Sequence, residues 1–206
     1  MADRELETDL IVVVPGITGS ALEVGGRDVW ALSGRAIMQG VLSLGRSVDR
    51  LKLPEGFGVA LLEAPGECEP GYGVRATGLM PDLHVVPGLW SPVKGYSGLV
   101  RRLRKQFGND GSTGGGVGPV IEFPYDWRLS NVVSARRLEA VVVPALEQWQ
   151  KQTGNPEARL VLVCHSMGGL VARWFLEVLG GSELTRWLVT IGTPYRGSVK
   201  SLGEGP

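Results

Sequence analysis

A serine and a histidine lie between an apolar run and two glycines in the segment VLVCHSMGGLVARW, residues 161–174. An apolar strand, a tight turn bearing a serine and a following helix form the setting of a nucleophile elbow, which raises the hydroxyl above the sheet. Such a turn demands small residues two positions before and after the serine. Cys164 and Gly168 meet that demand, although glycine is more usual at the first position. A helix start also favours the negative charge that develops during acyl transfer. The pattern predicts that Ser166 is a nucleophile.

Other interpretations of the same residues remain open. Ser166 and His165 could cap a buried helix, with Gly168 and Gly169 allowing close packing. Cys164 is a weaker candidate nucleophile, because a thiol at the end of a buried strand is usually inert. His165 is adjacent to Ser166 in the sequence, so its side chain should point elsewhere. We therefore expect His165 to be a lining or packing residue of the elbow and not the base.

Four near-continuous apolar runs predict the strands that would position this turn, at residues 9–14, 119–123, 159–164 and 187–191. Strands of this kind are typical of a parallel sheet that is covered on both faces. Helical patterns lie between them, so the sequence predicts an α/β fold.

Two helices are predicted from the spacing of apolar residues. The first covers residues 96–107, and the second runs from an N-cap at Ser130 to a stop near Gly154, with Pro144 expected to kink or split it. Basic residues gather on the outer face of the first helix, namely Arg101, Arg102, Arg104 and Lys105. We interpret this run as a solvated face, and a phosphate or lipid-headgroup site is the open alternative.

Residues 21–95 interrupt the alternation of strands and helices. They hold short strand-like pieces, such as 59–62 and 74–77, among many glycines and prolines. So long an interruption predicts a cap or lid region inserted within a single domain that covers residues 1–206. The glycine-rich stretch 108–119 lacks the lysine of a phosphate-binding loop, and we interpret it as a flexible surface connection.

Composition restricts the function classes. The chain has 206 residues, 43% of them hydrophobic, with 21 basic and 21 acidic residues. This balance provides no overall field for binding nucleic acid or an anionic membrane. The first apolar run is too short for a signal peptide or a membrane span, so we expect a cytoplasmic protein without a transmembrane segment. Cys68 and Cys164 are the only cysteines, and they suggest neither a disulfide framework nor a zinc site.

Five segments resemble the lecithin:cholesterol acyltransferase family, which includes lysosomal phospholipase A2 and phospholipid:diacylglycerol acyltransferases. In order they are IVVVPGITGSALE (11–23), VPGLWSPVKGYSGL (86–99), FPYDWRLS (123–130), VLVCHSMGGL (161–170) and LVTIGTPYRGS (188–198). The elbow is shared by many hydrolases, whereas PYDWR together with the VPG strand end is more specific. The resemblance implies an α/β-hydrolase core of mostly parallel strands with helices on both faces.

The resemblance also implies roles for particular residues. The backbone N–H groups of Ile17 and Met167 would hold the oxyanion of the tetrahedral intermediate. The segment Asp126, Trp127 and Arg128 would lie near the active-site face, and we interpret it as a structural Asp–Arg lock with Trp127 in the core. Trp30 and Trp90 lie in the inserted region, where they would form an acyl-chain wall or ordinary core.

This chain departs from the family pattern in two ways. It has no cysteine pair to close a lid loop after the first strand. An α/β-hydrolase presents its triad in the order serine, acid, histidine, yet residues 167–206 contain neither Asp nor His. The other histidine, His84, lies upstream, and we expect its ring to be too far from Ser166 to bond it. The family continues beyond the point matching Pro206, so we expect the fold to be C-terminally incomplete and to need that missing portion.

These observations predict a lipid O-acyltransferase or a lipase or phospholipase that acts through an acyl-serine intermediate. Its partners would be a lipid or ester substrate and an acyl acceptor, with no nucleic acid, metal or organic cofactor. Residues 1–206 alone would be inactive, and the exposed edge of the last strand would favour self-association. The open alternatives are a lipid-binding or scaffold protein that keeps the fold without catalysis, and a small-ester esterase or thioesterase.

Overall fold

The computed structural model describes residues 8–30, 73–81, 95–107 and 117–197. Its elements, in chain order, are β1 (Leu10–Val14), β2 (Ser20–Val24), β3 (Arg27–Trp30), β4 (Val74–Leu79), α5 (Ser97–Phe107), β5 (Val120–Glu122), α6 (Asn131–Thr153), β6 (Leu160–His165), α7 (Gly168–Val178), the short 3-10 helix η1 (Gly181–Leu184) and β7 (Thr185–Ile191). The predicted pieces at 59–62 and most of 108–119 lie outside the described residues, as do Cys68, His84 and Trp90.

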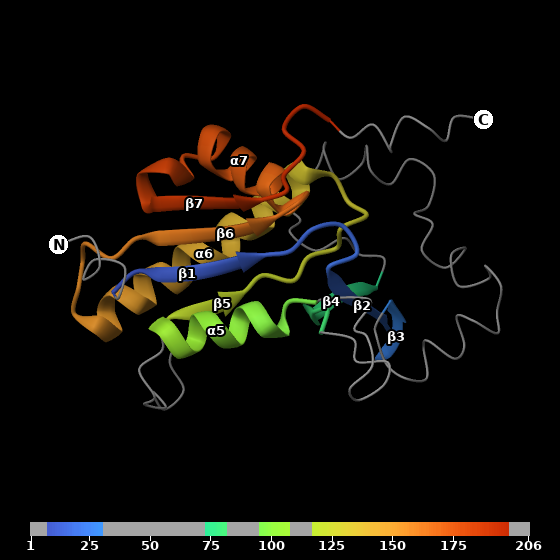
Figure 1. Ribbon diagram of the computed structural model, residues 1–206, viewed down its shortest axis with the longest axis horizontal. Helices are drawn as coiled ribbons and strands as arrows, with labels where there is room; N and C mark the ends of the chain where they lie inside the picture. Colours follow the sequence, from blue (N-terminus) through green and yellow to red (C-terminus); the bar gives the residue numbers. More distant parts are fainter. Residues whose placement is uncertain (1–7, 31–72, 82–94, 108–116, 198–206) are drawn as a thin grey trace.

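The main sheet has the strand order β5-β1-β6-β7, and every neighbouring pair is parallel. Helix α5 packs against one face of this sheet, while α6 and α7 cover the other (Figure 1). The sequence LIVVV of β1 is buried at all five positions because it lies between β5 and β6 with helices on both faces. The predicted α/β class is confirmed, and all four predicted strands are present.

A second, antiparallel sheet has the order β3-β2-β4. It follows directly from the loop at the carboxyl end of β1, and the chain leaves β4 close to the start of α5 (Figure 1). Two glycines with positive φ, Gly25 at 56° and Gly26 at 77°, form the tight turn between β2 and β3. The sequence interpretation found the core of β4 but missed β2 and β3.

Helix α6 begins and ends where the sequence predicts. The Ser130 side chain accepts a hydrogen bond from the Val132 N–H, and Gly154 ends the helix in the left-handed conformation with φ of 65°. Of the kink or split predicted at Pro144, the split is wrong, because the helix runs through this proline without interruption. Pro144 is exposed, so its ring does not enter the packed core.

The basic face of α5 is solvated, as predicted. Arg101, Arg102, Arg104 and Lys105 are all exposed, while Val100 on the inner face is buried. Arg104 forms an ion pair of 2.9 Å with Glu122 of β5, so part of this positive charge is neutralised locally. None of the helices in the described ranges combines the length and apolar character needed to cross a bilayer.

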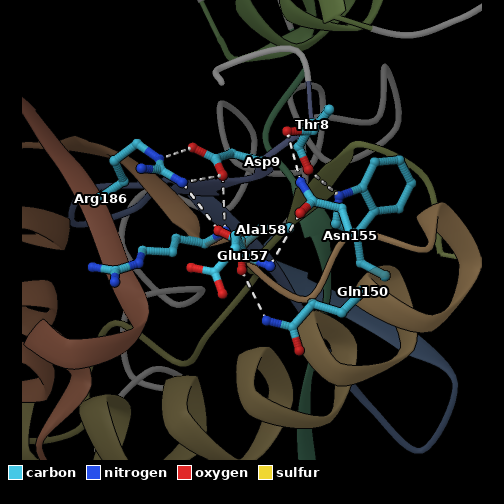
Figure 2. Close-up of polar contacts among 9 residues, drawn as sticks. Thr8, Asp9, Gln150, Asn155, Glu157, Ala158 and Arg186 are labelled. Atoms are coloured by element: carbon cyan, nitrogen blue, oxygen red, sulfur yellow. Dashed lines mark hydrogen bonds and ion pairs between the residues drawn. The ribbon is translucent and has the colours of Figure 1, made fainter. Parts of the chain in front are cut away.

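A polar cluster joins the amino-terminal ends of β1, β6 and β7. The buried Asp9 carboxylate accepts from Arg186 Nε at 2.6 Å and from the backbone N–H of Arg159 at 2.8 Å. Figure 2 shows Asp9 facing Arg186, with Glu157 nearby, whose carbonyl oxygen accepts from Arg186 Nη2. Because the strands are parallel, this cluster lies at the end of the sheet opposite the Ser166 turn.

Candidate functional site

Ser166 occupies the turn between β6, which ends at His165, and α7, which begins at Gly168. Its φ of 49° is positive, a conformation that costs an L-residue about 1–3 kcal/mol. Two backbone hydrogen bonds hold the turn: the Ser166 N–H donates to Ile191 O at 2.8 Å, and its carbonyl accepts from the Gly169 N–H at 3.1 Å. The predicted strand, strained turn and helix are therefore present around this serine.

The small residues of the turn are explained by close backbone contacts. A Cβ atom at Gly168 would collide with the carbonyl oxygens of Val14 and Pro15, so α7 approaches the end of β1 more closely than any side chain allows. A Cβ atom at Gly169 would collide with the Thr193 side chain. The expectation of close packing at these glycines is correct, and it holds together with the strained turn.

Cys164 lies two positions before the serine as a fully buried free thiol. Burial raises its pKa to about 12, because a thiolate would lose its hydration there. The thiol therefore stays protonated near neutral pH, which disfavours Cys164 as a nucleophile.

The loop after β1 lies directly beside the serine. A Cβ atom at Gly16 would be 2.9 Å from Ser166 Cβ, and the Gly19 N–H donates to Gly16 O at 3.0 Å to close the turn. Within the described residues, the N–H groups of Ile17 and Met167 donate to no other protein group. Both N–H groups thus belong to backbone next to Ser166 and are free to bind an oxygen atom.

His165 was expected to be a lining or packing residue of the elbow; its side chain is exposed, so it is not packed in the core. Its Nδ1 lies 2.8 Å from the hydroxyl of Tyr96, which also accepts a hydrogen bond of 2.8 Å from the Gly16 N–H. The sequence interpretation assigned Tyr96 only to the apolar stripe of a helix. The signal available for a further role was its phenol group, which needs a partner when partly buried.

The Asp–Arg lock predicted at the YDWR segment is present. Arg128 Nε donates to Asp126 Oδ1 at 2.8 Å and Nη2 donates to Oδ2 at 2.6 Å, with both side chains nearly fully buried. Such a bidentate pair fixes the backbone of the segment. Trp127 is half-buried against the core, and its Nε1–H donates to Ser20 O at 3.2 Å.

Tyr125 of this segment forms hydrogen bonds to the loop that lies beside Ser166. The Tyr125 hydroxyl donates to Pro15 O at 2.9 Å, and its backbone N–H donates to Ser20 Oγ at 3.1 Å. Burial strongly raises the pKa of Tyr125, so this hydroxyl remains a donor. The YDWR segment therefore holds in place the loop that lies beside Ser166.

Trp30 lies beside the same loop. Its ring meets that of Trp127 edge to face, with 5.5 Å between centroids, and its Nε1–H donates to Thr18 O. The Trp30 ring is half-buried, and Trp90, the other residue expected to form the wall, lies outside the described residues. No group of three or more potential metal ligands occurs among the described residues.

Comparison with known proteins adds two findings. The family model described as lecithin:cholesterol acyltransferase matches residues 96–204, just over half of the chain. The chain is also 36% identical over 75 residues to the uncharacterized protein YJR098C of Saccharomyces cerevisiae. That similarity covers 36% of this chain and only 10% of the yeast protein.

Proposed function

Because the chain belongs to the lecithin:cholesterol acyltransferase family, we propose that it carries the nucleophile of a serine-dependent enzyme that moves acyl groups of lipid esters. The enzyme would be an O-acyltransferase or a lipase or phospholipase. One observation supports this proposal above the others: Ser166 sits in a strained turn at the carboxyl end of β6, next to the loop after β1, and the Ile17 and Met167 N–H groups donate to no other group among the described residues. This arrangement suits acyl transfer.

In the proposed reaction, Ser166 Oγ attacks the ester carbonyl while a base accepts the hydroxyl proton. The carbonyl oxygen becomes an oxyanion, which accepts hydrogen bonds from the Ile17 and Met167 N–H groups. Removing one such donor typically costs about 3 kcal/mol of barrier. The intermediate then expels the alcohol, which takes the proton, and leaves an acyl-serine ester. Water or an acceptor alcohol attacks this ester and releases the product.

The base is the part of this reaction that the described residues do not supply. Cys164 is a buried neutral thiol, and the Nδ1 of His165 bonds to Tyr96. Residues 167–206 contain neither Asp nor His. We therefore propose that the enzyme uses a histidine and an acid from outside the described residues.

The test of the proposed function uses the protein as its gene encodes it. Wild type and Ser166→Ala would be incubated with a phospholipid, with and without a long-chain alcohol, and with a short-chain aryl ester. We expect serine-dependent loss of the phospholipid and, by mass spectrometry, an acyl adduct on the peptide containing Ser166. Equal turnover in the two proteins, or an adduct on another residue, would remove the nucleophile assignment. Turnover of the aryl ester alone would indicate a small-ester esterase or thioesterase.

Residues 1–206 alone are expected to lack ordinary esterase turnover. A serine hydroxyl is a poor nucleophile near neutral pH without a positioned base. Oxyanion donors and binding alone leave only about a thousandfold acceleration over water. The measurement is hydrolysis of a short-chain aryl ester beside Ser166→Ala. Serine-dependent turnover of several per second would contradict this prediction, and His84 would then be the first candidate base.

A second candidate function is a lipid-binding or scaffold protein without catalysis. The observation that favours it is that neither described side chain beside Ser166 is placed as a base, since the Cys164 thiol is buried and His165 Nδ1 lies 2.8 Å from the Tyr96 hydroxyl. Lipid binding by both wild type and Ser166→Ala, with no acyl adduct in the full-length protein, would support this candidate over the enzyme.

A further inference from the structure

The hydroxyl of Tyr96 lies at the meeting point of the loop and the serine turn. It accepts a hydrogen bond of 2.8 Å from the Gly16 N–H and lies 2.8 Å from His165 Nδ1. Gly16 and His165 lie where the two backbones approach each other, because a Cβ atom at Gly16 would be 3.2 Å from the His165 carbonyl oxygen. One phenol oxygen therefore bridges both sides of the candidate site.

Tyr96 is itself held by a chain of backbone hydrogen bonds. Its N–H donates to Met80 O at 2.9 Å, and the Met80 N–H donates to Gly19 O at 2.9 Å. A Cβ atom at Gly19 would come within 2.9 Å of the Tyr96 hydroxyl oxygen, so the ring fits tightly against the loop. These contacts close a ring of hydrogen bonds from the loop through Met80 and Tyr96 back to the loop.

The proton of the Tyr96 hydroxyl suggests a direction for the bond to His165. The Gly16 N–H can only donate, so the phenol oxygen accepts there. Burial raises the pKa of Tyr96, although the hydrogen bond from Gly16 lowers it, so the hydroxyl keeps its proton near neutral pH. That proton can be donated to His165 Nδ1, which lies 2.8 Å from the phenol oxygen, in the tautomer that carries its ring hydrogen on Nε2.

We propose that Tyr96 is a positioning residue, which fixes the Gly16 loop against the Ser166 turn by accepting from Gly16 and donating to His165 Nδ1. This inference rests on the proposed function, because the group that it positions is the neighbouring Ile17 N–H, the proposed oxyanion donor. His165 acts through Nδ1 as the acceptor that orients the phenol. Oxyanion donors work only when they are placed before the reaction, so loss of this bridge weakens catalysis.

The first test is independent of activity and uses nitrogen NMR on the full-length protein. We expect His165 to be mainly the Nε2–H tautomer in wild type, with Nδ1 unprotonated, when the spectra are recorded at a pH at which the ring is neutral. In Tyr96→Phe the Gly16 amide should exchange its hydrogen at least tenfold faster, and the tautomer preference should weaken. A proton on Nδ1 in wild type, or unchanged exchange at Gly16 in Tyr96→Phe, overturns the inference.

The second test measures kcat and KM of the same variants on the serine-dependent reaction. Tyr96→Phe should lower kcat by about tenfold to a hundredfold, the scale of a misplaced catalytic group, with KM within about twofold. His165→Ala should lower kcat similarly, whereas His165→Asn keeps an acceptor oxygen near the position of Nδ1 and should recover most of the loss. Tyr195→Phe, at an exposed tyrosine whose ring lies under Arg173, is the matched control and should match wild type.

The two tests separate failure of the inference from failure of the proposed function. A wild-type protein without Ser166-dependent turnover contradicts the proposed function, and the NMR result then decides the hydrogen-bond bridge by itself. Turnover that Tyr96→Phe leaves unchanged, or a loss in His165→Ala that His165→Asn does not recover, overturns the positioning role.

Discussion

The backbone of Ser166 is strained, because its positive φ of 49° suits glycine better than any residue with a side chain. Ser166→Gly should therefore be more stable than Ser166→Ala by about 1 kcal/mol, because alanine keeps the strain and glycine relieves it. Both variants should lose the proposed acyl transfer. Urea unfolding of the two proteins gives the comparison. An alanine variant as stable as the glycine variant would mean that the turn stores no strain.

At the same scale, the sequence predicted the serine turn but not its hydrogen-bond partners. The turn is local, so a strand pattern, a serine and two glycines within ten residues were enough to identify it. The bridge from Tyr96 and the burial of Asp9 depend on contacts between residues 69 to 177 positions apart. A single sequence carries no record of which distant groups meet, so these partners could not be predicted.

Among the elements, β1, β6 and β7 are joined at their amino ends by the buried pair of Asp9 and Arg186. Arg186→Leu should lower the free energy of unfolding by about 3 kcal/mol, because it leaves the Asp9 carboxylate buried beside only a backbone N–H. This is the low end of the usual range, since the Arg186 side chain is 24% exposed. Urea unfolding measures the change.

Two further variants control this experiment. Adding Asp9→Asn to Arg186→Leu removes the stranded charge and should recover part of the lost stability. Arg173→Leu breaks an exposed pair with Glu177 on α7 and should leave the unfolding midpoint essentially unchanged. An equal loss in the Arg173 and Arg186 variants would refute a special role for the buried pair.

Helix α6 contains Pro144 in its interior, and we expect this proline to lower the stability of the helix. Pro144 has no N–H to donate to the carbonyl of the preceding turn, yet the helix continues to Thr153. Because Pro144 is exposed, Pro144→Ala can restore that hydrogen bond without disturbing the core, and should raise the free energy of unfolding by about 2 kcal/mol. Glu147→Ala, also exposed on α6, should change it little. A neutral or destabilising Pro144→Ala would show that the helix is adapted to the ring.

The elements that the sequence predicted are those with one dominant pattern. Strand β1 and most of β6 are buried on both faces, so their apolar runs stand out, and Ser130 and Gly154 mark α6 by their capping chemistry. Strands β2 and β3 were missed because SALEV and RDVW are short and mix polar with apolar residues. The adjacent pair Gly25 and Gly26 was the available hairpin signal. The predicted split at Pro144 does not occur, because packing of the apolar side of α6 against the core stabilises the helix by more than the lost hydrogen bond destabilises it.

At the scale of the whole molecule, one face of β7 exposes large apolar side chains among the described residues. Trp187, Val189 and Ile191 alternate along the strand with exposed fractions of 54%, 45% and 46%, while Leu188 packs toward α7 and the core. Within the described residues, β7 pairs only with β6, so its other edge is open. An open edge beside an apolar face favours association between molecules.

Val189→Lys should therefore reduce self-association of residues 1–206, because a charge in the middle of this face opposes its burial. Sedimentation velocity at several protein concentrations measures the effect. Val141→Lys is the matched control, since Val141 is exposed to a similar degree, 41%, on helix α6. Equal association of the two variants would show that the contact lies elsewhere.

The order of strands in the main sheet has a consequence for how the protein is made. Strand β1 emerges from the ribosome first, but its partners are β5 and β6, with Val12 opposite Ile121 and Leu162. Roughly 100 to 150 more residues must be synthesised before either partner exists, which takes on the order of ten seconds at about 5–20 residues per second. The most apolar strand of the sheet is thus synthesised long before the strands with which it pairs. During that interval LIVVV is open to wrong pairing, so the yield of folded protein should depend on translation speed and on chaperones that bind short apolar segments.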